Sequence, residues 1–117
     1  MGVSYGQALR AGRRAAGLTQ RDLAGRAGLD FTYISKLEND RIPPPATDTV
    51  VLLARVLGMS TDVALALAGK LPTEVEQQVS GSAAAQEFLR EAGALRLSED
   101  QWRSLKDTLK GLSGDRR

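Results

Sequence analysis

The side chains best suited to binding lie close together between Thr19 and Asn39, in the stretch TQRDLAGRAGLDFTYISKLEN. If the second half of this stretch is helical, at about 100° per residue, one face is apolar and carries Ile34 and Leu37. The opposite face carries Phe31, Thr32, Ser35 and Lys36. That face offers hydroxyl groups, one ammonium group and one aromatic ring, and it lacks the Glu/Lys pairs of an ordinary solvated helix surface. The pattern indicates a surface that recognises a polar partner.

Two short helices joined by a tight turn are expected to position this face. Thr19 suits an N-cap, and Asp22 lies three residues further on, where it can complete the cap. Gly28 supplies the left-handed residue that ends the first helix, and Asp30 caps the second. This layout predicts a helix-turn-helix, whose second helix is shaped to enter a major groove. A helical hairpin that only packs is the alternative, but it leaves the polar outward face unexplained.

Composition argues against catalysis. The chain has no cysteine and no histidine, which excludes disulfides, thiol chemistry, the usual zinc sites and imidazole catalysis. Pairs of carboxylates occur at Glu74/Glu76, Glu87/Glu91 and Glu99/Asp100. All of them fall on polar helical faces or in first turns, whereas acid–base catalysis needs one carboxylate in an apolar pocket. We therefore expect neither an enzyme, nor a cofactor, nor a metal site.

Charge is unevenly distributed along the chain. The net charge is +2, but residues 1–41 hold seven basic and four acidic side chains, whereas residues 71–117 hold seven and eight. The excess of positive charge therefore lies in the half that contains the helix-turn-helix, where phosphate groups would be met. An excess of this size is weak evidence by itself. No apolar run resembles a signal peptide or approaches the length of a membrane span, so we expect a cytoplasmic protein without a membrane partner.

Several short motifs carry a resemblance to a known family. They are Leu18-Thr19-Gln20, Leu23-Ala24, Ala27-Gly28 and the run Tyr33-Ile34-Ser35-Lys36-Leu37-Glu38-Asn39. Together they resemble the Cro/CI-type (XRE) family of bacterial and phage DNA-binding regulators, over a region from about Leu9 to Leu67. The resemblance implies a lambda-repressor-like five-helix DNA-binding bundle within an all-α chain, with double-stranded DNA as partner.

The resemblance also implies roles for individual residues. The implied contacts to DNA bases come from Phe31, Thr32, Ser35 and Lys36. The implied contacts to the DNA backbone come from Thr19, Gln20, Tyr33, Asn39, Arg41 and Arg14. In the family, an arginine at the position of Arg13 pairs with a glutamate at the position of Glu38. The sequence supports this ion pair independently, because Glu38 lies at the edge of the inward face and a carboxylate there needs a partner; two unrelated surface charges are the alternative.

The other helices of the bundle follow from apolar periodicity. A first helix is expected from about Tyr5 to Ala16, with Leu9, Gly12 and Ala16 facing inward. A fourth helix begins near Thr47 and buries Val50, Leu53, Ala54 and Leu57. A fifth helix, ended by Gly69, carries Val63, Leu65 and Leu67. We predict that residues 1–69 form the DNA-binding domain and that 70–81 is a linker or a short helix over 73–79.

Residues 82–117 are predicted to form a helical dimerisation segment. One helix runs from Ser82 to Gly93, and a capping box from Ser98 to Gln101 begins the last helix. The expected interface residues are Phe88, Leu89, Trp102, Leu105, Leu109 and Leu112. The last four form an apolar stripe along the last helix that the five-helix bundle does not need, so the stripes of two copies, with Phe88 and Leu89, could cover each other. The alternative is that the last helix folds back on its own bundle.

These observations predict a sequence-specific DNA-binding transcriptional regulator that is associated with the nucleoid. The simplest form of this hypothesis is a repressor that binds a palindromic operator as a homodimer. The alternative is an antitoxin or adaptor that uses the C-terminal helices to bind a protein partner, such as a toxin or a protease.

Overall fold

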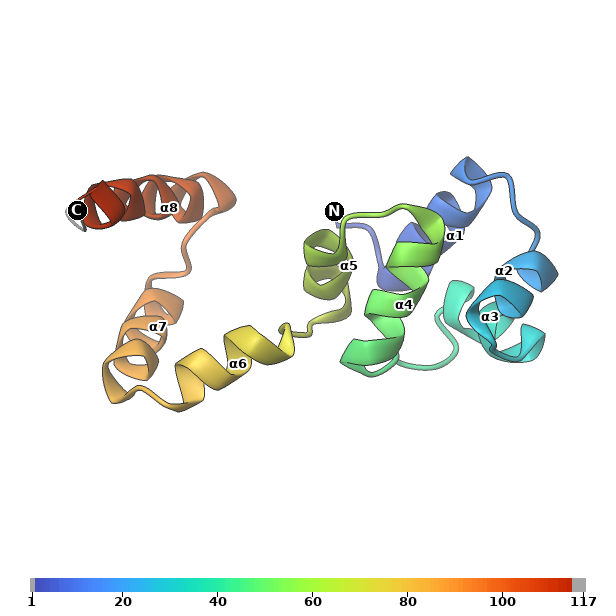
Figure 1. Ribbon diagram of the computed structural model, residues 1–117, viewed down its shortest axis with the longest axis horizontal. Helices are drawn as coiled ribbons and strands as arrows, with labels where there is room; N and C mark the ends of the chain where they lie inside the picture. Colours follow the sequence, from blue (N-terminus) through green and yellow to red (C-terminus); the bar gives the residue numbers. More distant parts are fainter. Residues whose placement is uncertain (1, 115–117) are drawn as a thin grey trace. The chain divides into compact units, whose positions relative to one another are not determined.

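The computed structural model describes residues 2–114, with side chains through Leu112, and these residues form eight α-helices and no strand (Figure 1). The helices are α1 (Tyr5–Ala15), α2 (Gln20–Ala27), α3 (Phe31–Glu38), α4 (Thr47–Leu57), α5 (Thr61–Ala68), α6 (Thr73–Ser80), α7 (Ala83–Leu95) and α8 (Glu99–Gly114). The predicted all-α class, a five-helix repressor-like bundle followed by further helices, is confirmed. The chain divides into two compact units after Glu76, within the stretch 70–81.

The first unit is a bundle of α1 to α5 around one apolar core. The helix pairs in contact are α1 with α3 and α5, α2 with α3 and α4, and α4 with α5. The core consists of Tyr5, Leu9, Leu23, Ala24, Ile34, Leu37, Val50, Leu53, Ala54, Leu57, Ala64, Leu65 and Ala68. Because α3 contributes two residues that are almost completely buried, its opposite face has to point out of the bundle.

Local hydrogen bonds begin and end the helices where the sequence predicts it. The Thr19 hydroxyl accepts from the Asp22 backbone N–H at 3.0 Å, and the Asp22 carboxylate accepts from the Thr19 N–H at 3.0 Å. Gly28 ends α2 with φ of 68°, in the left-handed region. The Asp30 carboxylate accepts from the Thr32 N–H at 2.9 Å and begins α3. The helix-turn-helix is therefore set largely by short-range interactions.

Two inward-facing assignments were wrong. Ala16 is exposed because α1 ends at Ala15 and Ala16 is only its cap. Val63 is 57% exposed, whereas Ala64 and Leu65 are buried, because these two positions of α5 face the core.

Gly6 marks the closest approach of α1 to α3. A Cβ atom at this position would collide with the backbone carbonyl oxygens of Leu37 and Glu38. A second link lies beside it, since the Ser4 hydroxyl donates to the Asp40 carboxylate at 2.8 Å. Asp40 itself has φ of 55°, a conformation that is uncommon outside glycine. The N-terminus of α1 therefore holds the C-terminal end of α3 in place.

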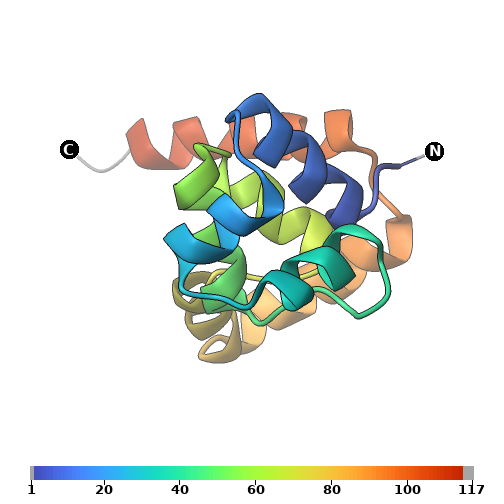
Figure 2. The same ribbon diagram turned by 90° about the vertical axis from the view of Figure 1, so that its right-hand side faces the viewer.

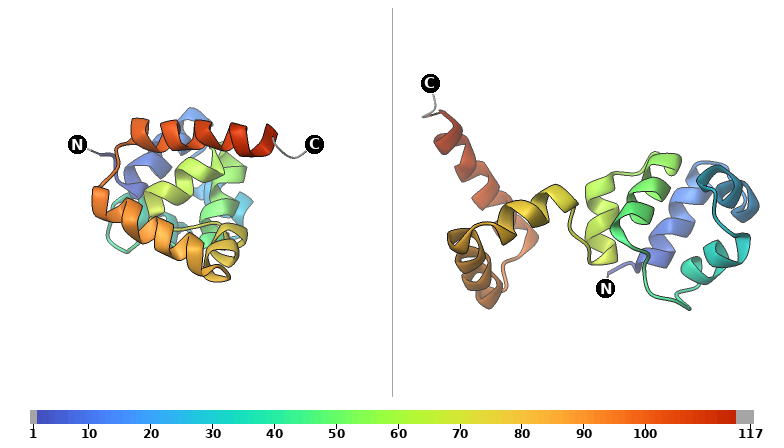
Figure 3. Two further views of the ribbon diagram at one scale, coloured as in Figure 1. Left: turned by 90° about the vertical axis from the view of Figure 1, so that its left-hand side faces the viewer. Right: turned by 60° about the horizontal axis from the view of Figure 1, so that its bottom comes forward.

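The second unit contains very little core. Figure 3 (left) looks onto α7 (orange) and α8 (red). Ala92 is the only buried side chain of α7 and α8 among those described.

No helix in residues 2–114 combines the length and apolar character needed to cross a bilayer.

Replacing Gly6 by alanine is predicted to destabilise the first unit by about 1–3 kcal/mol, because backbone atoms have to move to make room. Gly25→Ala is the matched control, since nothing lies within 4 Å of a Cβ there. That substitution in α2 should stabilise by up to about 1 kcal/mol through helix propensity. Urea unfolding of both variants measures the difference. Equal effects of the two substitutions would contradict the close approach.

Candidate nucleic-acid interface

The outward face of α3 is accessible to solvent. Figure 2 looks onto the side of the first unit where α2 and α3 lie. Thr32 and Lys36 are exposed, and Phe31 and Ser35 are partly exposed. On the inner side of the same helix, Ile34, Leu37 and Glu38 are buried. The structure therefore brings the four predicted base-contacting residues together on one face.

The Glu38 carboxylate at the end of α3 is the centre of a buried hydrogen-bond network. Its Oε2 accepts from Arg13 Nε at 2.6 Å, and its Oε1 accepts from an Arg13 terminal N–H at 2.9 Å. Gln20 Nε2 donates to the same Oε1 at 3.0 Å, and Arg10 Nε does so at 3.4 Å. Arg13 also donates to the Leu18 carbonyl oxygen at 2.9 Å. This network joins α1, α2 and α3 around a side chain that is 0% exposed.

The two charges of this ion pair stabilise each other. Burial by itself raises the pKa of Glu38, but the hydrogen bonds from Arg13 and Gln20 and the Arg13 charge outweigh it, so the pKa is lowered overall. The Glu38 hydrogen bond is the main reason that the pKa of Arg13 is raised. Both groups are charged at neutral pH. The geometry agrees with the predicted pair and excludes two unrelated surface charges.

Two of the predicted backbone-contacting residues already use their side-chain amide groups in internal hydrogen bonds. Gln20 donates to Glu38, as described. Asn39 Oδ1 accepts from an Arg10 terminal N–H at 2.7 Å, and Asn39 Nδ2 donates to the Ser35 carbonyl oxygen at 2.8 Å. A side-chain amide group has two N–H bonds, and Gln20 and Asn39 each use one of them in these contacts. The second N–H of each residue can therefore donate to another acceptor, such as a phosphate oxygen.

The other predicted backbone-contacting residues differ in their surroundings. Arg14 and Arg41 are exposed. The Thr19 hydroxyl caps α2, so its interaction with DNA would have to share that oxygen. Tyr33 is partly buried against the core, near Tyr5, whose pKa is raised to about 12 mainly by its burial.

Three contributions to this region were not predicted from the sequence. Neither Arg10 nor Gln20 was expected to bind Glu38, although a basic residue one turn before Arg13 is a usable signal. Arg21 was also missed: its guanidinium carbon lies 4.4 Å from the centre of the Phe31 ring. The spacing of residues along the chain does not predict that contact, because Arg21 and Phe31 lie on two different helices.

The residues predicted for the dimer interface lie on α7 and α8 of the second unit. All are exposed, from 37% for Trp102 and Leu105 to 63% for Leu112. Side chains of α7 and α8 line a groove of about 580 Å³, with Phe88, Ala92, Leu95 and Leu105 as apolar walls. Within the described residues, no cluster of carboxylates could hold a metal ion.

The first unit matches a known sequence family. Residues 4–67 match the model described as a helix-turn-helix domain, and this span covers α1 to α5. The chain belongs to the helix-turn-helix domain family. The assignment to Cro/CI-type regulators is confirmed, and these are DNA-binding proteins rather than enzymes.

Individual relatives agree with this assignment. The chain is 36% identical over 80 residues to RghRB, an uncharacterised HTH-type transcriptional regulator of Bacillus subtilis strain 168. The match covers 66% of this chain, and the chain spans 58% of the length of that relative. The chain is also similar to SinR, described as a master regulator for biofilm formation and solved in complex with DNA. The two chains are 26% identical, with a TM-score of 0.50. The match covers 52% of this chain and 97% of the SinR chain.

A longer match concerns the fold only. A complex of the SinR and SinI proteins aligns with 94% of this chain and 98% of the other, with 22% identity and a TM-score of 0.51. At this level of identity the likeness shows that the helices follow the same fold. The individual contacts to DNA stay predictions.

A double-mutant cycle tests the ion pair. Removing Glu38 alone leaves a largely buried guanidinium unpaired, with an expected loss of about 3–5 kcal/mol. Urea unfolding of Arg13→Ala, Glu38→Ala and the double variant should give a coupling energy well above the 0–1 kcal/mol of surface pairs. Arg103 and Asp100, 3.5 Å apart and exposed, form the matched control pair. Coupling no larger than that of the control would contradict a structural role.

The lowered pKa of Glu38 also predicts a pH dependence. Its stabilising contribution should be complete above the unfolded pKa of about 4.3 and should disappear as pH falls through the lower folded value. The free energy of unfolding of the wild type should therefore decline as the pH falls below about 5. Glu38→Gln should start lower and decline less steeply, because one of the titrating groups is gone. Parallel profiles of the two proteins would show that Glu38 does not carry the acid dependence.

Proposed function

We propose that this protein is a sequence-specific transcriptional regulator, most simply a repressor, which binds a palindromic operator as a homodimer within the bacterial nucleoid. The observation that carries the proposal is the division of α3 into two faces. Ile34, Leu37 and Glu38 are fixed inside the bundle, so Thr32, Ser35 and Lys36 project from a rigid support. A recognition helix needs this arrangement, because base contacts discriminate only when their donors are held in place.

In this proposal, each side chain on the outward face of α3 makes a different contact with the DNA bases. Lys36 donates to the O6 and N7 acceptors of a guanine, and Thr32 and Ser35 bond to either base of a pair. The edge of the Phe31 ring can contact a thymine methyl group. Contacts to phosphate groups come from Thr19, Gln20, Tyr33, Asn39, Arg41 and Arg14. These contacts set orientation and most of the affinity, and the base contacts set the sequence preference.

The second unit supports the proposed homodimer because it cannot bury its own apolar side chains. A unit of this size is at the lower limit for independent folding even with a good core. Here the stripe Trp102, Leu105, Leu109 and Leu112 is open to solvent. A two-fold interface would cover two such stripes at once.

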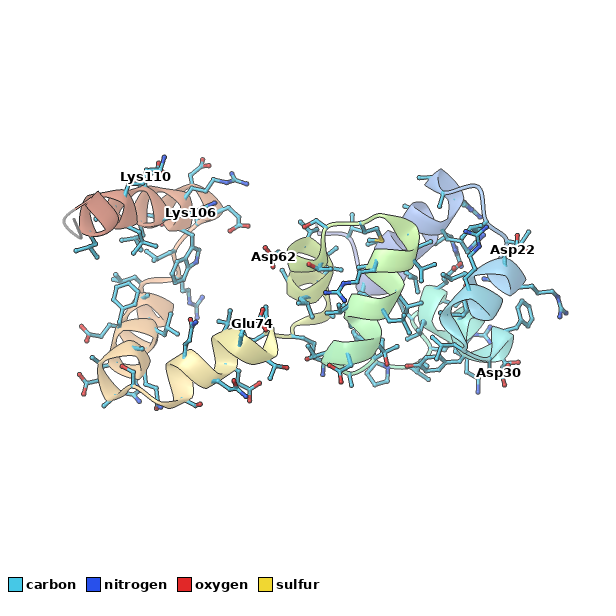
Figure 4. All side chains as sticks on the ribbon, viewed as in Figure 1. Asp22, Asp30, Asp62, Glu74, Lys106 and Lys110 are labelled. Carbon is cyan, nitrogen blue, oxygen red and sulfur yellow. The ribbon has the colours of Figure 1, made fainter. Side chains whose placement is uncertain are left out.

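The charges on α7 and α8 are of opposite sign at positions that could meet if two copies of the chain paired. The groove between α7 and α8 carries Glu87 and Glu91 along α7. Helix α8 carries Lys106 and Lys110 (Figure 4). An α8 helix from a second copy would bring lysines to the acidic rim while its leucines fill the apolar groove. A two-fold axis of this kind would let two α3 helices meet half-sites about 34 Å apart.

A second candidate function is an adaptor or antitoxin that holds a protein partner. The observation in its favour is the same exposed groove, since a partner helix could fill it as well as a second copy could. SinR, which shares the fold, has been solved in a complex with the SinI protein. On this reading DNA binding is secondary, and a partner such as a toxin or a protease occupies α7 and α8.

Substitution of Lys36 tests base recognition. Duplexes selected from a random pool provide the preferred site, and Lys36→Ala should weaken binding to it by about 1–3 kcal/mol per half-site contact. Arg41→Ala is the comparison, because loss of a phosphate contact should weaken all duplexes alike and lower the salt dependence. Titrations on selected and scrambled duplexes measure both. If Lys36→Ala loses the same affinity on both, it does not read bases.

Light scattering tests the dimer. The full chain should be a dimer at tens of micromolar, and residues 1–70 alone should be monomeric. Leu109→Glu should also dissociate the dimer, because a charge would enter the apolar stripe. Val63→Glu is the matched control, since Val63 is 57% exposed and Leu109 is 58% exposed but Val63 lies in the first unit. A monomeric full chain would contradict the proposal, and so would dimerisation of 1–70 with unchanged affinity.

A further inference from the structure

Arg21 lies in the first turn of α2, with its guanidinium placed over an aromatic ring of α3. The guanidinium carbon is 4.4 Å from the centre of the Phe31 ring. Phe31 is itself partly buried and packs against the core, so the ring is a fixed platform. Arg21 itself is exposed to solvent.

Neither an ion pair nor the helix dipole explains the position of Arg21. In the described part of the chain, Arg21 forms no ion pair; the arginines that do are Arg10, Arg13 and Arg103. A positive charge in the first turn of a helix also opposes the helix dipole, which favours cations at the other end. The contact with Phe31 therefore keeps the positive charge of Arg21 at a position that the dipole of α2 disfavours. The charge stays accessible to a binding partner.

We infer that Arg21 is a phosphate-binding residue of the DNA interface and that the Phe31 ring is its positioning element. This inference rests on the proposed function. In a helix-turn-helix the first helix crosses the DNA backbone while the N-terminal part of the second helix meets base edges. Arg21 lies on the first of these helices and Phe31 begins the second, so the pair stands where backbone and groove meet.

Stacking suits a phosphate contact for a physical reason. A guanidinium interacts with a ring through its flat face, whereas its N–H groups point outward along the edge. The edge of Arg21 can therefore bind two phosphate oxygens while the face stays on Phe31. A flexible arginine loses side-chain conformational entropy when it binds DNA. Because the contact with Phe31 already restricts the Arg21 side chain in the free protein, less entropy is lost on binding.

The ring has two distinguishable roles under this inference. Its edge can contact a thymine methyl group, as proposed above, and its face holds Arg21. The first role affects one base pair, and the second affects every duplex through the phosphate contact. The two are separated by comparing Phe31 variants in the presence and in the absence of Arg21.

The test measures DNA binding by Arg21→Ala, Phe31→Leu and the double variant of the full chain. Leucine keeps the apolar packing of position 31 and removes the ring. Each variant is titrated with the selected duplex and with a scrambled duplex over a range of salt concentrations. Arg26→Ala is the matched control, because Arg26 is exposed on the same helix and its removal changes the net charge equally. Urea unfolding verifies that every variant is folded.

Arg21→Ala should weaken both duplexes by a similar factor, about five- to tenfold at 0.1 M salt, and lower the salt slope by about 0.9 per protomer. Arg26→Ala should change both quantities much less. Phe31→Leu should weaken the scrambled duplex in the wild-type background and have no further effect on it in the Arg21→Ala background.

Three results would overturn the inference: unchanged binding by Arg21→Ala, a loss confined to the selected duplex, or additive effects of the two substitutions on the scrambled duplex. Failure of the proposed function looks different. In that case the wild-type protein itself selects no duplex, and Lys36→Ala does not change any preference.

Discussion

The placement of α3 within the first unit depends on one buried carboxylate that is charged. Glu38 is the last residue of α3 and has no exposed side-chain surface, so its charge has to be balanced inside the protein. Donors from Arg10 and Arg13 on α1 and from Gln20 on α2 supply that balance. Because the three helices share one acceptor, α3 cannot rotate or slide without breaking bonds to both neighbours. A structural ion pair thus also sets the orientation of the face proposed to read DNA.

The end of α3 is held from a second side by packing. Gly6 lets α1 approach the carbonyl oxygens of the last turn of α3, and Ser4 bonds to Asp40 directly after it. Directional hydrogen bonds and tight backbone contact therefore act on the same turn. At the other end of α3, Phe31 packs against the core. Helix α3 is consequently restrained at both ends, while the middle of its outer face stays free.

The features that could be predicted from the sequence are those that short-range chemistry decides. Thr19 with Asp22, Gly28 and Asp30 each act within a few residues, and each cap or turn forms as expected. The capping box of Ser98 and Gln101 forms for the same reason. Long-range partners are harder, because spacing along the chain gives at most a weak indication of which distant residues meet, as the helical spacing of Arg10 and Arg13 does. Arg10 and Gln20 at Glu38, and Gly6 at α3, fall in this class, and Val63 was misplaced because burial depends on where a helix faces its neighbours.

Methylation interference on the selected duplex tests most directly whether the outer face of α3 enters the major groove. Methyl groups are placed at guanine N7, in the major groove, or at adenine N3, in the minor groove, and bound and free duplexes are compared. The account predicts interference by N7 methylation in two symmetric half-sites, no interference by N3 methylation there, and loss of one N7 signal per half-site with Lys36→Ala. Interference confined to adenine N3, or the same N7 pattern for wild type and Lys36→Ala, would contradict it.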